Sequence, residues 1–135
     1  MRIMILADQA EPTLWESLDK RKLEGVDLIL SCGDLPANYL SFLTCFTYAP
    51  ILYVHGNHDA RYERTPPEGC ICIEDSIYVH EGIRILGLGG SMRYRKGPHM
   101  YSTVPPTATT TRALRMRTAL PQSLPVVPVT CSTVV

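Results

Sequence analysis

The sequence predicts an α/β fold in which short parallel strands alternate with helices. Three apolar runs, at residues 2–7, 26–31 and 51–55, have the composition of buried strands. Two stretches with apolar side chains at helical spacing, residues 14–19 and 37–43, lie between these runs, and each follows a proline. Alternation of strand and helix favours a parallel sheet with right-handed crossovers.

Length and composition indicate one globular domain. A chain of 135 residues can bury a single core, and 45% hydrophobic with 19% charged residues is typical of soluble proteins. No apolar run reaches about 18 residues. The first apolar run ends at Asp8, which makes it too short for the apolar core of a signal peptide. We therefore expect no membrane span and no signal peptide, and a cytoplasmic location.

The cysteines indicate reduced thiols rather than a disulfide framework. Their number is odd, and they lack the paired CxxC spacing of a zinc site. They are Cys32, Cys45, Cys70, Cys72 and Cys131.

The middle of the chain predicts a second group of strands. After the turn-rich residues 65–69, three isoleucine-rich segments at 70–73, 77–80 and 83–88 are expected to form consecutive antiparallel strands. The Gly87-Leu88-Gly89-Gly90 sequence lacks the full GxGxxG pattern of a dinucleotide-binding loop, so we expect a tight turn after a strand.

Charge and composition both change along the chain. All 13 acidic residues lie at or before Glu81, so residues 1–81 carry a net charge of −7 and residues 82–135 carry +7. Only two short basic clusters follow, and no aromatic residue after Tyr101 could stack on bases, so we expect no nucleic-acid partner.

The last part of the sequence differs from the rest. Residues 102–135 contain eight threonines and five prolines but no glycine, acidic or aromatic residue. We expect residues 1–101 to form the folded part and residues 102–135 to be a poorly ordered tail. The abrupt change suggests the hypothesis that an altered reading frame has been fused to a truncated enzyme.

Polar residues follow each of the first three predicted strands. Asp8 follows the first, Gly33-Asp34 the second and Gly56-Asn57-His58-Asp59 the third. Each alone has an ordinary explanation as a helix cap or turn, but parallel strand ends meet at one edge of a sheet. Carboxylate, amide and imidazole groups gathered there are ligands for divalent metals, and one carboxylate could bridge two ions.

With these motifs, residues 1–100 resemble the N-terminal half of the calcineurin-like metallophosphoesterases. The family pattern is D-x-H, then G-D, then G-N-H-[DE], and the GNHD at 56–59 is its most specific part. The resemblance implies a layered α/β/β/α sandwich, here incomplete at the C-terminus, and two divalent ions of the Mn, Fe or Zn type.

The resemblance also implies a role for each matching residue. Asp8 matches a ligand of the first metal, Asp34 the bridging carboxylate and Asn57 a ligand of the second metal. His58 matches the catalytic histidine, which contacts the phosphate and protonates the leaving group. Asp59 matches the residue that holds this histidine.

The sequence departs from the family pattern in two places. Where D-x-H has a histidine, the chain has Asp8-Gln9-Ala10, so Glu11 or water would have to substitute. The two later histidine motifs, V-x-H-like and G-H-x-H, do not occur after residue 100. The remaining histidines lack a recognisable ligand spacing and are interpreted as structural or exposed; they are His55, His80 and His99.

Two functions follow from the sequence. The first is a weakly active metal-dependent phosphoesterase that hydrolyses phosphate mono- or diesters. The alternative is a catalytically inactive relative that retains the fold. The sequence leaves the substrate and the oligomeric state open.

Overall fold

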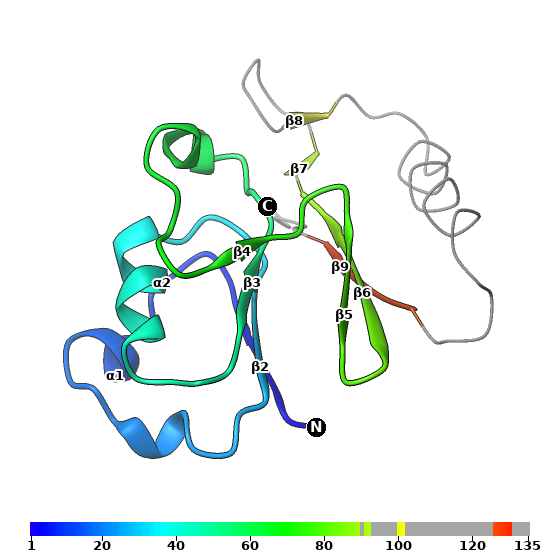
Figure 1. Ribbon diagram of the computed structural model, residues 1–135. Coiled ribbons are helices and arrows are strands. Elements are labelled where there is room, and N and C mark those ends of the chain that lie inside the picture. Colours follow the sequence, from blue (N-terminus) through cyan, green and yellow to red (C-terminus); the bar gives the residue numbers. More distant parts are fainter. Residues whose placement is uncertain (90, 93–99, 102–125, 131–135) are drawn as a thin grey trace.

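A computed structural model describes residues 1–89, 91–92, 100–101 and 126–130 of the protein (Figure 1). It is a mixed α/β structure, and its first sheet has four strands in the order β1-β2-β3-β4. All neighbouring strands in this sheet are parallel, which confirms the predicted parallel core. The strands are β1 (Ile3–Leu6), β2 (Leu28–Ser31), β3 (Ile51–Tyr53) and β4 (Ile71–Cys72).

Two α-helices connect the first three strands. Helix α1 (Pro12–Trp15) begins at a proline, and α2 (Ala37–Thr44) follows Pro36. Proline suits a helix start because the first N–H groups of a helix have no partner within it. Helix α1 is shorter than the predicted segment 14–19. Two short 3₁₀ helices, η1 (Lys20–Lys22) and η2 (Asp59–Glu63), complete the described helical structure.

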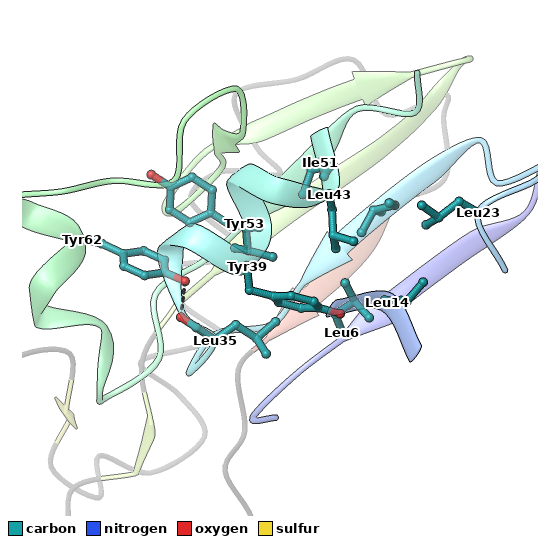
Figure 2. Close-up of a cluster of buried hydrophobic side chains, with 11 residues drawn as sticks. Leu6, Leu14, Leu23, Leu35, Tyr39, Leu43, Ile51, Tyr53 and Tyr62 are labelled. Atoms are coloured by element: carbon teal, nitrogen blue, oxygen red, sulfur yellow. Dashed lines mark hydrogen bonds between the residues drawn. The ribbon is translucent and has the colours of Figure 1, made fainter. Parts of the chain in front are cut away.

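The helices cover one face of the four-stranded sheet and form the larger hydrophobic core there (Figures 1 and 2). Tyr39, Leu40 and Leu43 of α2 are fully buried against Ile29 and Ile51 of the sheet. Figure 2 also shows a polar link at the edge of this core, where the Tyr62 hydroxyl donates to the carbonyl oxygen of Leu35 at 2.5 Å.

A second sheet packs on the other face. Its strands are β5 (Ile77–His80), β6 (Ile83–Leu88) and β9 (Val126–Thr130), in the order β5-β6-β9. Strands β5 and β6 are antiparallel, as predicted, whereas β6 and β9 are parallel. The core between the sheets consists of Leu28, Leu30, Leu52, Val54, Ile73 and Ile85. Strands β7 (Ser91–Met92) and β8 (Met100–Tyr101) form a separate parallel pair.

The structure corrects the prediction for residues 70–73. They do not pair with β5; instead β4 lies parallel to β3, with Tyr53 opposite Cys72. Parallel pairing requires a long crossover, and residues 54–70, which include η2, supply it. The predicted strand at residues 83–88 is confirmed as β6, and the turn expected after it extends to Gly90, outside the described residues.

The predicted tail contains one described element. Strand β9 lies alongside β6, and sequence analysis did not find it. The expectation of poor order for the other residues of 102–135 falls outside the described part of the chain. Among the described residues, no helix is long and apolar enough to cross a membrane.

Candidate functional site

The loops after β1, β2 and β3 carry the residues that the sequence singled out. Main-chain hydrogen bonds continue beyond the strands, since the N–H of Asp8 donates to the carbonyl of Gly33 at 3.2 Å. The pKa of the Cys32 thiol is raised, mainly by burial and in addition by the Asp8 carboxylate. Asp8 is therefore close enough to the end of β2 to act on Cys32 electrostatically. The first two loops are therefore neighbours.

Two of the predicted ligands have an uncommon backbone conformation. Asp8 has φ of 62° and Asp34 has φ of 60°, in the left-handed region that aspartate tolerates better than most residues. Such a conformation costs about 1 kcal/mol or more, and it often occurs at functional sites. It is not sufficient evidence of a site here, because Asp75 and Glu81 in turns share it.

The Asp34 carboxylate lies directly against the loop that follows β3. Its Oδ1 accepts a hydrogen bond from the backbone N–H of His58 at 2.8 Å. A Cβ atom on Gly56 would lie 2.3 Å from the same oxygen and 2.7 Å from the Asp34 backbone nitrogen. Only glycine at position 56 therefore allows this close approach.

The Asp59 side chain also connects these two loops. It is buried, and its Oδ2 accepts the backbone N–H groups of Gly56 at 2.8 Å and Asp34 at 2.7 Å. Burial raises the pKa of Asp59, while the two N–H donors act in the opposite direction. The G-D and G-N-H-D motifs thus form one hydrogen-bonded unit.

This arrangement differs from the expected role of Asp59. The His58 side chain is exposed, and within the described part of the chain no hydrogen bond joins it to the Asp59 carboxylate. The Asp59 carboxylate is buried and directed at backbone N–H groups, which need partners when they are buried, whereas the His58 side chain lies at the surface.

The candidate metal ligands are of the expected chemical type but few in number. Asp8 and Asp34 supply carboxylates, and Asn57 supplies an amide from a buried position. Among the described residues, no group of three or more His, Cys, Asp or Glu side chains could hold a metal ion.

The residues near the missing histidine do not make up for it. Ala10 is partly buried and packs against the larger hydrophobic core. Glu11 is engaged elsewhere, because its Oε1 accepts from the Thr13 hydroxyl at 2.6 Å and from the Lys22 ammonium at 3.2 Å.

Sequence reasoning missed a contact that adjoins this site. The His55 ring and backbone both bind the Glu74 carboxylate, whereas the sequence suggested only a structural or exposed histidine and a turn at Glu74-Asp75. The two residues are 19 positions apart and match no motif, so no sequence signal could have identified the pair.

An open cavity of about 420 Å³ lies away from this site, at the amino end of β1. Two of its cations are engaged within the chain, Arg21 with Asp19 and Lys22 with Glu11. It is lined by Arg2, Ile3, Met4, Arg21, Lys22 and Val26. We therefore do not include it in the candidate site.

Comparison with models of protein families, with curated proteins and with solved structures gave no match in any of the three. The resemblance to calcineurin-like metallophosphoesterases therefore rests on the motifs of this chain. The hydrogen-bonded unit of Asp34, Gly56, His58 and Asp59 is the structural observation that bears on it.

Proposed function

We propose that this chain is a metal-dependent phosphoesterase of the calcineurin-like type, with weak activity. The observation that carries the proposal is the contact of the Asp34 carboxylate with the backbone of residues 56–58. It brings the predicted bridging ligand beside the loop that carries Asn57 and His58. Neighbouring parallel strands would bring the two loops near each other in any case, but the fit of Gly56 against the Asp34 carboxylate is closer than two unrelated turns require.

The donor chemistry suits Mn²⁺, Fe or Zn²⁺, which accept carboxylate and amide oxygens. Asp8, Asp34 and Asn57 are the residues that would hold such ions. Bound ions of this kind lower the pKa of water and offset the charge of a phosphate ester. Three donors from the described residues are fewer than two ions require, so we expect weak binding.

His58 is the residue that we propose for proton transfer. Its side chain is exposed to solvent while its backbone is held by Asp34, so the ring is accessible to a substrate and the loop that carries it is restrained. General acid catalysis contributes about 10²–10⁴-fold, which is small beside the roughly 10²¹-fold that the slowest phosphate-ester hydrolyses require. Weak metal binding should therefore limit the rate.

A second candidate is a catalytically inactive relative that retains the fold. The observations that favour it are Ala10 in place of a histidine and the engagement of Glu11 by Thr13 and Lys22. In that case the loops would keep their structure without binding metal.

The test is hydrolysis of p-nitrophenyl phosphate and bis-p-nitrophenyl phosphate in the presence of Mn²⁺. We would compare the wild type with Asp34→Ala and His58→Ala, and use Glu24→Gln, an exposed carboxylate in a turn outside the three loops, as the matched control. Slow turnover that Asp34→Ala abolishes and Glu24→Gln preserves supports the enzyme. Equal background rates in all four proteins support the inactive relative.

A further inference from the structure

Glu74 lies where the chain passes from the first sheet to the second. The preceding residue, Ile73, still bonds to β3, since its N–H donates to the carbonyl of Tyr53 at 2.9 Å. Glu74 itself forms an isolated parallel bridge with Gly87 of β6. Its backbone is therefore connected to both sheets.

Two glycines leave room for Glu74 to lie beside β6. A Cβ atom on Gly87 would lie 2.1 Å from the carbonyl oxygen of Ile73, and one on Gly89 would lie 2.5 Å from the carboxyl carbon of Glu74. Any other residue at position 87 would push the Ile73 backbone away from β6, and a side chain at position 89 would displace the Glu74 carboxylate. The glycines at 87 and 89 thus have a packing role in placing the Glu74 side chain.

The Glu74 side chain points back to the end of β3, where it binds His55 twice. One oxygen, Oε2, accepts the backbone N–H of His55 at 3.1 Å and also contacts Nδ1 of the ring. The two side chains are only 16% and 14% exposed. The His55 ring also makes edge contacts with Tyr53 and Tyr62, at centroid distances of 5.6 and 5.7 Å.

A carboxylate so little exposed needs hydrogen-bond donors, and a bond to a charged group is stronger than a neutral one. The contact with Glu74 also raises the pKa of His55. Because this His is adjacent to Gly56, the carboxylate restrains the chain immediately before the loop that holds Asn57 and His58.

The backbone of the loop is then fixed by three acidic side chains in sequence. Glu74 holds the N–H of His55, Asp59 holds that of Gly56, and Asp34 holds that of His58. Asp34 and Asp59 belong to the candidate site, whereas Glu74 reaches it from the connection between the two sheets.

We propose that Glu74 is a positioning residue, which fixes loop 56–59 relative to the second sheet and so sets the position of Asn57 and His58. The loop's importance for metal binding rests on the proposed function, but its restraint by Glu74 does not. Residues that orient a metal ligand without touching the ion typically change metal affinity by about 10–100-fold.

The test uses Glu74→Ala, Glu74→Gln and the exposed control Glu24→Ala in the full chain. Glutamine keeps an oxygen that can accept both His55 donors, whereas alanine keeps none. We would measure amide hydrogen exchange of Gly56 and His58 by NMR, with the sheet amides of Ile29 and Cys32 as internal references. Mn²⁺ affinity would be measured separately by calorimetry.

We expect Glu74→Ala to speed exchange at Gly56 and His58 by about 10-fold or more while Ile29 and Cys32 stay unchanged, because local opening can occur without global unfolding. Glu74→Gln and Glu24→Ala should resemble the wild type. Loop exchange unchanged in Glu74→Ala, or equal acceleration of the sheet amides, would overturn the positioning role.

The metal titration separates this inference from the proposed function. If the wild type binds Mn²⁺, Glu74→Ala should raise the dissociation constant by about 10-fold or more; an unchanged constant would overturn the inference. If the wild type binds no Mn²⁺, the proposed function is wrong, and the exchange rates alone decide whether Glu74 holds the loop.

Discussion

Gly56 is the position where the joining of the two motifs can be tested most directly. In Gly56→Ala the added methyl group would lie 2.3 Å from Oδ1, 2.5 Å from Cγ and 2.7 Å from the backbone nitrogen of Asp34. The nitrogen cannot rotate away as a side chain could. The loops must therefore separate, which weakens the hydrogen bonds at 2.7 Å to Asp59 and at 2.8 Å from His58.

Overpacking costs about 1–3 kcal/mol and each weakened hydrogen bond about 1 kcal/mol, so we expect a loss of about 2–5 kcal/mol of unfolding free energy. With a urea slope of about 2 kcal/mol per molar, the midpoint should fall by about 1–2.5 M. Fluorescence of the single tryptophan, Trp15, can report unfolding, because its ring packs 5.4 Å from Tyr39 and 5.3 Å from Phe42.

Two further variants isolate the cause. Gly82 has no atom within 4 Å of an added Cβ, so Gly82→Ala reports only the strain of its φ of 79°, about 1 kcal/mol. Asp34→Gly removes the carboxylate, and Gly56→Ala should cost less in that background than in the wild type. A loss below about 0.5 kcal/mol in Gly56→Ala, within the range of an ordinary surface change, would refute the close approach.

Three other predictions follow from single contacts. Asp59→Ala should lose about 2–4 kcal/mol in urea unfolding because two backbone N–H groups lose their acceptor, and an equal loss in Asp59→Asn, which keeps an acceptor, would contradict this. The hydrogen bond to Glu74 raises the pKa of His55 above 6.5. The contribution of the protonated His55 to the free energy of unfolding should therefore be complete below about pH 6.5 and lost as the pH rises through the raised pKa. Unfolding of His55→Gln and wild type should therefore differ more at low pH than at high pH, and a constant difference would exclude the pair. Iodoacetamide should modify the exposed Cys45 before Cys70, because burial raises the pKa of Cys70 to about 11; equal rates by peptide mass spectrometry would disprove it.

The sequence was sufficient for the first three strands of the first sheet because they are continuous apolar runs. Strands β2 and β3 are buried on both faces, so the composition of residues 26–31 and 51–55 alone identifies them. β4 has two residues, both exposed, and its partner depends on where the crossover returns the chain. No local pattern could have placed it beside β3.

β9 was missed for a different reason. Pro128 lies in the middle of the strand, opposite Leu86, and proline argues against a strand unless it is at an edge. β9 is an edge strand in the described sheet, so the proline is tolerated. Only the neighbouring strand identifies this position, and the sequence does not indicate which strand that is.

The site was predictable as a set of loops but not as a set of contacts. Because parallel strand ends meet at one edge of a sheet, the order of the strands is enough to place Asp34 near residues 56–59. The sequence could not show that Asp59 binds backbone N–H groups rather than His58, because both lie within its reach. The His55 contact with Glu74 depends on how the two sheets pack.

The left-handed backbone at Asp8 has a consequence for how this chain can change over generations. Glycine would relieve the local cost of about 1 kcal/mol, and the exposed Asp8 side chain makes no hydrogen bond in the described part of the chain that would be lost. A lineage that no longer needs the carboxylate should therefore accept Asp8→Gly readily, because the substitution would stabilise the fold. Retention of aspartate among natural variants would be a record of selection for its charge.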